Sequence, residues 1–256
     1  LLAFIAPQSL NDKSVTVQVN KNFNVSSHMV DGIDYSDVLF SQMNETKKIL
    51  EEETPERLII FGGDCSVTQV PFEYLKRNYG SQIGILWLDA HPDISSPLTS
   101  SHLHEMPLAN LLGLNADLKL TQVEHPYPAT KVFLGGLIEE KLRPMDMACK
   151  DLHIRIGTPE QLSQNSDLVL EWIKEENIKF LAVHWDLDVL SPAEPYLDPA
   201  TFPAAVGRMK LDEISRLLVD VSNMAEIVGL SITEHLPWDA FNMRKSLAKI
   251  SIFNGQ

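Results

Sequence analysis

The stretch IGILWLDAHPD at residues 83–93 decides the fold. Its first six residues are apolar or glycine, which is typical of a strand buried on both faces of a parallel sheet. Four other short runs, rich in Ile, Val and Leu, show the same pattern. We therefore expect strands over residues 57–61, 83–88, 131–134, 179–185 and 226–232.

Helical patterns lie between these runs. Residues 159–176 follow Thr158, a good N-cap residue, and begin with Pro159, which is favoured at the first helical position. This alternation predicts one α/β domain over residues 1–256, with helices on both faces of a mostly parallel sheet. The expected helices cover residues 36–52, 66–78, 104–113, 159–176 and 210–223.

The composition excludes several classes of protein. No apolar run approaches about 18 residues, so we expect no membrane span. The apolar segment LLAFIA at residues 1–6 is too short for a secretory signal, and we expect a buried strand there. The chain has 35 acidic and 21 basic residues, a net charge of −14, which argues against a nucleic-acid partner. Its two cysteines, Cys65 and Cys149, fit a reducing, cytoplasmic location.

Polar side chains follow four of the expected strands, at the edge where parallel strands end and where ligands bind in such folds. A carboxylate-rich set with one or two imidazoles suits a divalent ion such as Mn²⁺, Mg²⁺ or Zn²⁺. Aspartate is short enough to bridge two ions about 3.5–4 Å apart. The sequences that follow the strands are GGDCS (62–66), DAHPD (89–93), DLD (186–188) and TEH (233–235).

Strand geometry groups these side chains. Residues i and i+2 of a strand point the same way, so Asp186 and Asp188 share a face. Asp89, His91 and Asp93 also share a face as long as the backbone stays extended, which the proline before Asp93 favours. A single aspartate at a strand end is usually only a turn former or a helix N-cap. Two such groups at the ends of two buried strands predict a metal site instead.

The order of these motifs resembles that of the ureohydrolase superfamily, which includes arginase, agmatinase and formiminoglutamase. Residues 94–99, ISSPLT, look more like arginase than agmatinase. The resemblance implies a single three-layer αβα domain with a mostly parallel sheet of about eight strands, and a homo-oligomer. It also implies two Mn²⁺ ions bridged by a hydroxide that attacks a guanidinium carbon and releases urea. The matching motifs are GGDCS (62–66), DAHPD (89–93), HEMP (104–107), HWDLD (184–188) and SITEHLP (231–237).

The resemblance implies roles for individual metal ligands. Asp89 and Asp186 would bridge the two ions, and His91 and Asp188 would complete one of the two sites. Asp93 would serve the other site, together with the residue at position 65.

Three residues would act on a small guanidino or amidino substrate. His104 would pass a proton to the leaving amine, as a histidine of near-neutral pKa can. Glu234 would hold the guanidinium through bidentate hydrogen bonds. Ser95 occupies the position where arginases place an Asn for the amino-acid end of the substrate. This last change weakens the assignment of free arginine as the substrate.

Four further positions depart from the family pattern: Cys65 replaces His, His184 replaces Ser, Glu105 replaces Gly and Ser231 replaces Asp. A thiolate is a soft ligand and a poor match for Mn²⁺, so we expect the site at Cys65 to be the weaker one. His184 lies two residues before Asp186 and should point to the metal face. We expect its ring to replace the missing ligand or to hydrogen-bond a ligating aspartate. The alternative is that His184 only fills space.

Three functions are open at this point. The first is a metal-dependent hydrolase of the C–N bond of a linear amidine or guanidine. The second is a catalytically impaired relative that binds one metal ion or a cationic ligand, and the third is an amidohydrolase with a single ion. Retention of Glu234, His104 and four aspartates favours an enzyme, because a protein that is only a scaffold has no need for buried charges without bound ions. Cys65 favours the second function.

Overall fold

A computed structural model describes residues 1–8, 12–19, 29–192, 207–235 and 240–253. Within these residues, six strands form one sheet in the order β1-β6-β5-β2-β3-β4, and every neighbouring pair is parallel. The five predicted strands are confirmed, each to within one residue at either end. The strands are β1 (Leu58–Phe61), β2 (Ile83–Leu88), β3 (Val132–Gly135), β4 (Arg155–Gly157), β5 (Phe180–Asp186) and β6 (Glu226–Thr233).

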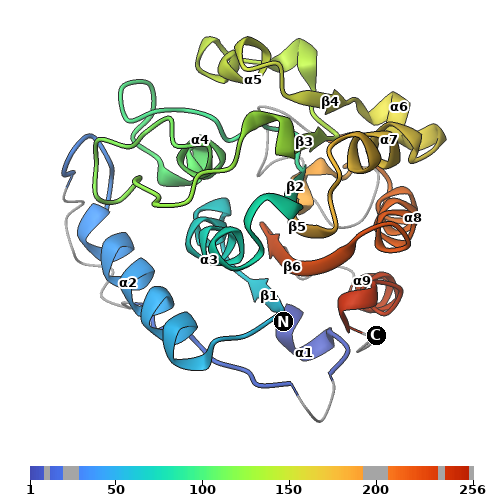
Figure 1. Ribbon diagram of the computed structural model, residues 1–256, viewed down its shortest axis with the longest axis horizontal. Helices are drawn as coiled ribbons and strands as arrows, with labels where there is room; N and C mark the ends of the chain where they lie inside the picture. Colours follow the sequence, from blue (N-terminus) through green and yellow to red (C-terminus); the bar gives the residue numbers. More distant parts are fainter. Residues whose placement is uncertain (9–11, 20–28, 193–206, 236–239, 254–256) are drawn as a thin grey trace.

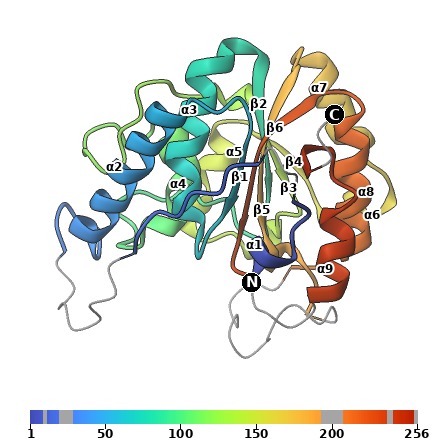
Figure 2. The ribbon, with the colours of Figure 1, turned by 90° about the horizontal axis from the view of Figure 1, so that it is seen from below.

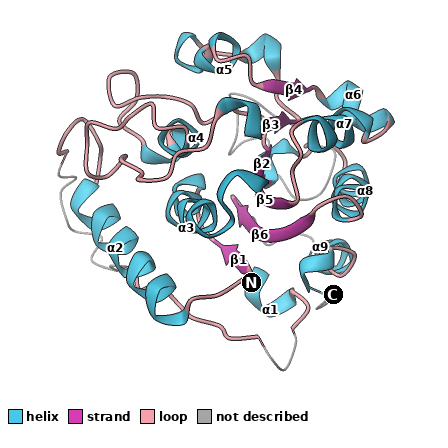
Figure 3. Cartoon of the chain, viewed as in Figure 1, coloured by secondary structure: helices cyan, strands magenta, loops and turns pink. Residues whose placement is uncertain are grey.

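Helices cover both faces of the sheet, as predicted (Figure 2). Helices α2, α3 and α4 lie on one face, and α7, α8 and α9 lie on the other (Figures 1 and 3). The fold is therefore a three-layer αβα arrangement. The helices are α1 (Leu2–Ile5), α2 (Ser36–Glu53), α3 (Gln69–Tyr79), α4 (Pro107–Leu111), α5 (Ala148–Asp151), α6 (Pro159–Gln164), α7 (Asp167–Glu175), α8 (Leu211–Ser222) and α9 (Ala240–Leu247).

The two faces of the sheet carry separate apolar cores. Along β2, Ile85 and Trp87 join the core beneath α3 and α4, whereas Leu86 and Leu88 join the core beneath α7 and α8. This alternation follows from the two-residue period of a strand. By the same rule, Asp89, which lies two residues after Trp87, is expected on the same face of the sheet as Trp87.

The first six residues do not form the buried strand that their apolar character suggested. Residues Leu2–Ile5 form the short helix α1, in which Leu2 and Ile5 are buried and Phe4 is 84% exposed. Burial at positions three apart, with an exposed residue between them, is the pattern of a helix that packs on one side only. Here α1 lies beside α9 at the edge of the core beneath α7 and α8 (Figure 2).

The predicted helix 159–176 is two helices. Thr158 caps α6 as predicted, because its hydroxyl accepts a hydrogen bond from the Gln161 N–H at 3.4 Å and the Gln161 side chain accepts one from the Thr158 N–H at 2.9 Å. Asn165 is extended and ends α6. Its side chain accepts a hydrogen bond from the Asp167 N–H, the first residue of α7, at 3.0 Å.

No helix in the described ranges combines the length and the apolar character that crossing a membrane requires.

Candidate metal centre

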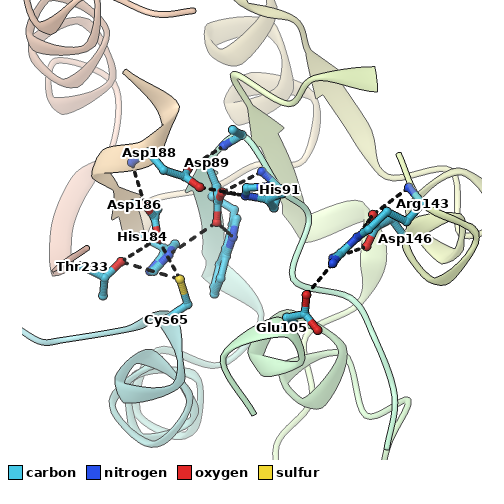
Figure 4. Close-up of polar contacts among 12 residues, drawn as sticks. Cys65, Asp89, His91, Glu105, Arg143, Asp146, His184, Asp186, Asp188 and Thr233 are labelled. Atoms are coloured by element: carbon cyan, nitrogen blue, oxygen red, sulfur yellow. Dashed lines mark hydrogen bonds and ion pairs between the residues drawn. The ribbon is translucent and has the colours of Figure 1, made fainter. Parts of the chain in front are cut away.

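The candidate metal ligands lie where β2 and β5 end, beside the 3₁₀ turn Cys65–Thr68 that follows β1 (Figure 4). All strands of the sheet are parallel, so these chain segments reach the same edge. Two groups of candidate ligand atoms form there, and within each group the atoms lie within 4.8 Å of one another. The first group is Asp89, His91 and Asp188, and the second is Cys65, Asp89, His184 and Asp186.

The first group is held by backbone hydrogen bonds. His91 Nδ1 lies 2.8 Å from Asp188 Oδ2 and 3.5 Å from Asp89 Oδ1. The His91 N–H donates to Asp89 Oδ1 at 2.7 Å, and the Ala90 N–H donates to Asp188 Oδ1 at 3.2 Å. Both carboxylates are therefore oriented toward the imidazole by the turn that follows β2.

The second group adds a thiol to two carboxylates. Cys65 Sγ donates a hydrogen bond to Asp186 Oδ2 at 2.9 Å, and the Thr233 hydroxyl donates to the same oxygen at 3.2 Å. Asp89 Oδ2 accepts a hydrogen bond from Trp87 Nε1 at 3.1 Å. Asp89 belongs to both groups, so the two candidate sites share a carboxylate.

His184 points toward this centre. Its Nδ1 atom lies 2.9 Å from the Thr68 hydroxyl and 2.8 Å from the Ser231 hydroxyl, and its ring stacks on Trp87 with centroids 3.8 Å apart. The strand register explains this arrangement, because His184 is paired with Trp87 on β2 and with Ser231 on β6. Its other nitrogen, Nε2, lies 3.9 Å from Asp89 Oδ2 and has no hydrogen-bond partner among the described residues.

Asp93 departs from the expected geometry. The backbone does not stay extended to this residue, because Asp93 has a φ of +46°. The turn has a physical reason, since the Asp93 carbonyl accepts hydrogen bonds from the N–H groups of Leu108 and Ala109 at 3.1 and 3.3 Å and so caps the start of α4. The Asp93 carboxylate is buried, and its Oδ2 atom has no partner among the described residues. Its charge is close enough to act on the Cys65 thiol.

Several buried acidic side chains lie close together at this centre, and their pKa values are raised. Burial, reinforced by the charge of Asp188, raises the pKa of Asp186 to about 8. Burial and the charge of Asp89 raise the pKa of Asp188 to about 6. Burial and the charge of Asp93 raise the pKa of the Cys65 thiol well above its ordinary value. A bound cation would counteract all three shifts, because it favours the ionised form of each group.

The two histidines differ in their charge. Burial opposes the charged form of His91, but the hydrogen bonds to Asp188 and Asp89 outweigh it and raise the pKa of His91 to about 12. Burial lowers the pKa of His184 to about 3, so this imidazole is neutral. Neutral imidazole is the form that binds metal ions, so an ion bound by His91 would displace the proton that the two carboxylates hold there.

The predicted substrate residues lie around the centre. Glu234 is half-buried, has a φ of +57°, and its N–H donates to the Gly63 carbonyl at 2.9 Å. Burial and the charge of Asp186 raise the pKa of Glu234 to about 8. His104 is exposed and its ring stacks on His102 with centroids 5.4 Å apart. Pro237, the last residue of the matching motif, lies outside the described residues.

Two of the positions that depart from the family pattern, Ser95 and Glu105, belong to neither group of candidate ligands. Ser95 is buried at 1% exposure, and its hydroxyl has no partner among the described residues. Glu105 forms an ion pair with Arg143, which also makes a bidentate pair with Asp146 at 2.9 and 3.0 Å. Figure 4 shows this charged group to one side of the centre.

Three residues that support the ligands were not predicted from the sequence. Trp87 orients Asp89, Thr68 holds His184, and Thr233 donates to Asp186. Trp87 could have been found, because it lies two residues before Asp89 on the same face of the strand. Thr233 belongs to the TEH motif at the end of a strand, but nothing in the motif marks it as a donor to Asp186. Thr68 lies on another segment of the chain, and no local signal marks it.

The fold and the centre define a three-layer α/β protein with a carboxylate- and histidine-rich candidate metal site. The Arginase family model matches residues 5–252, and the chain belongs to this family. It is 27% identical to the arginase of Entamoeba histolytica over 202 residues, which cover 73% of this chain and 64% of that protein. The chain therefore spans less than two thirds of the length of this curated relative.

Solved structures show the same fold. The Entamoeba histolytica arginase in complex with L-ornithine superposes with a TM-score of 0.73 and 19% identity, covering 93% of this chain and 82% of that one. The Bacillus caldovelox arginase superposes with a TM-score of 0.71 and 20% identity, covering 93% of this chain and 81% of that one. These likenesses confirm the predicted fold class.

Proposed function

We propose that this protein is a metal-dependent hydrolase that cleaves the C–N bond of a linear amidine or guanidine and releases urea from a guanidino substrate. The observation that carries the proposal is the position of Asp89, whose carboxylate belongs to both groups of candidate ligands. A shared carboxylate is what two neighbouring divalent ions require.

The residues fit a divalent cation. Asp89, His91 and Asp188 would hold one ion, and their oxygen and nitrogen atoms suit Mn²⁺, Mg²⁺ or Zn²⁺. Asp186 would join Asp89 at the second ion. The Asp93 carboxylate, buried and with one oxygen unpartnered, is a further candidate there. When bound, such ions lower the pKa of water and so supply a nucleophile near neutral pH.

Substrate binding would depend on Glu234, and proton transfer to the leaving amine would depend on His104. A guanidinium beside Glu234 would favour the ionised carboxylate and could donate two parallel hydrogen bonds to it. His104 is exposed, so it can exchange protons with solvent and pass one to the leaving amine. The buried position of Ser95 gives no support to its role as a substrate contact.

Several finer points belong to the same proposal. Manganese is the ion we expect at the Asp89, His91 and Asp188 group, and the substrate is a small guanidino or amidino molecule. The arginase relative that was solved with L-ornithine supports a ligand of this size. The homo-oligomer and the cytoplasmic location are likewise proposals, which rest on the family resemblance and on the sparse cysteines.

The test is urea release from a panel of guanidino compounds by protein that has been stripped of metal and reloaded with Mn²⁺, with Zn²⁺ or with both ions. We expect urea from at least one compound, and none from the stripped protein. The Asp188→Asn variant should be inactive, whereas the Asp146→Asn variant, changed at a buried aspartate away from the centre, should stay active. Absence of urea with every compound after reloading would refute the proposal.

A second candidate function has one observation in its favour. Asp89, His91 and Asp188 form a group of candidate ligands that includes neither Cys65 nor Asp186, and those two side chains are hydrogen-bonded to each other at 2.9 Å. An amidohydrolase with one ion, or an impaired relative that only binds one ion, would use this first group alone. Either would bind a single ion per chain, and only the amidohydrolase would turn over a substrate.

A further inference from the structure

We propose that Cys65, Asp89, His184 and Asp186 form a binding site for a thiophilic divalent ion, Zn²⁺ rather than Mn²⁺. The proposal deepens the proposed function, since it names the ion at the second site of the same centre. It concerns ion binding, which can be measured without any substrate.

The first observation is the free nitrogen of His184. The side chain is fully buried, yet Nε2 has no hydrogen-bond partner among the described residues and faces Asp89 Oδ2 at 3.9 Å. A buried polar atom left without a partner is costly, so it indicates a missing ligand. A metal ion between Nε2 and the carboxylates would satisfy it.

The second observation is how the ring is held. Thr68 and Ser231 place their hydroxyls 2.9 and 2.8 Å from Nδ1, and Trp87 stacks on the ring face. Metal-ligating histidines are oriented in this way, by a hydrogen bond to the nitrogen that does not bind the metal. The surrounding contacts therefore fix the rotamer that aims Nε2 at the centre.

The third observation is the thiol. Cys65 is 5% exposed, forms no disulfide, and its Sγ atom lies 2.9 Å from Asp186 Oδ2. One sulfur, one imidazole nitrogen and carboxylate oxygens make a four-ligand set typical of Zn²⁺, because thiolate is too soft for Mn²⁺. The other group, which contains Asp89, His91 and Asp188, has no sulfur. The two sites should therefore select different ions.

The test uses Co²⁺ as a spectroscopic probe that takes the place of Zn²⁺. Metal-stripped protein titrated with Co²⁺ should develop the near-ultraviolet charge-transfer band of a cobalt–thiolate bond, and Zn²⁺ should abolish the band. The band should persist in the Cys149→Ser variant, the matched control at the other buried cysteine, and vanish in Cys65→Ser. Absence of the band in wild-type protein would overturn the proposal.

Two histidine variants separate ligation from packing. In His184→Asn the amide can still reach Thr68 and Ser231 but nothing replaces Nε2, so Co²⁺ should bind about tenfold more weakly or worse. His184→Gln places an amide group near the Nε2 position and should lose less affinity. Equal affinity in wild type and His184→Asn would remove His184 from the site.

A measurement on the wild-type chain covers the case in which a variant does not fold. Zn²⁺ should slow alkylation of Cys65 several-fold more than Mn²⁺ does, whereas Cys149, quantified by mass spectrometry in the same digest, should respond to neither ion. Equal protection of Cys65 by both ions would contradict the proposal. Urea release is a separate readout, so failure of the hydrolase and failure of the zinc site can be told apart.

Discussion

Replacing Asp186 with asparagine should stabilise the metal-free protein. The Asp186 carboxylate is buried beside Asp188, and its pKa is raised to about 8. Since the pKa is higher in the folded chain than in the unfolded chain, the folded state binds more protons between about pH 4 and pH 8. The stability of the metal-free protein should therefore fall as the pH rises through this range.

The magnitude follows from the two pKa values. The ordinary aspartate pKa is about 3.9, and each pH unit of difference corresponds to about 1.36 kcal/mol, so ionising Asp186 costs at most on the order of 5 kcal/mol at pH 8. Relaxation and water entry reduce this cost, and we expect Asp186→Asn to raise the free energy of unfolding by about 2–4 kcal/mol at pH 8. The asparagine keeps an acceptor for the Asp188 N–H, which donates to Asp186 Oδ1 at 2.7 Å.

The assay is urea denaturation of metal-stripped protein at pH 6, 7 and 8. Asp146→Asn is the matched control, because Asp146 is a buried aspartate whose charge is paired with Arg143 at 2.9 and 3.0 Å. We expect the control to lose about 1–3 kcal/mol, the opposite sign. If Asp186→Asn destabilises the stripped protein as Asp146→Asn does, the ionised Asp186 carboxylate does not destabilise the metal-free fold, and the prediction is wrong.

Three further predictions concern the site. Glu234→Gln should lower kcat/KM for a guanidino substrate about 30- to 150-fold, or about 2–3 kcal/mol, with unchanged metal content; an unchanged rate would remove Glu234 from the site. Trp87→Phe removes the donor to Asp89 and should weaken metal binding about tenfold, measured by competition with a chelating dye; equal affinity would show that the indole only packs. Calorimetry with Mn²⁺ should find the His91 and Asp188 site tighter than the Cys65 site, and two equally tight sites would contradict this.

The strand pattern was predictable because each strand of the core is a nearly unbroken apolar run. Strand β4 was not, because it has only three residues and begins with the exposed Arg155. The helix α1 was not predicted either, because four residues are too few to distinguish a one-sided helix from a buried strand. The break between α6 and α7 depends on the extended Asn165. A polar residue at that point is common in continuous helices as well.

The candidate ligands were predictable from motifs, but their contacts were not. Cys65, His184 and Ser231 each depart from the family pattern, and they lie 47 or more positions apart along the chain. The register of β5 on β6 pairs His184 with Ser231, and the turn after β1 brings Cys65 to Asp186. Register is set by the packing of the whole sheet, so it cannot be read from any single segment.

The most direct test of the metal centre is the element-resolved metal content of Asp89→Asn beside wild-type protein, after loading with Zn²⁺ and Mn²⁺ and removal of free ions. Asp89 is the one residue in both groups of candidate ligands. We predict that the wild-type chain retains divalent ions and that Asp89→Asn retains almost none, with Asp146→Asn as the unchanged control. A wild-type chain without bound ions, or an Asp89→Asn variant with the wild-type content, would contradict the account.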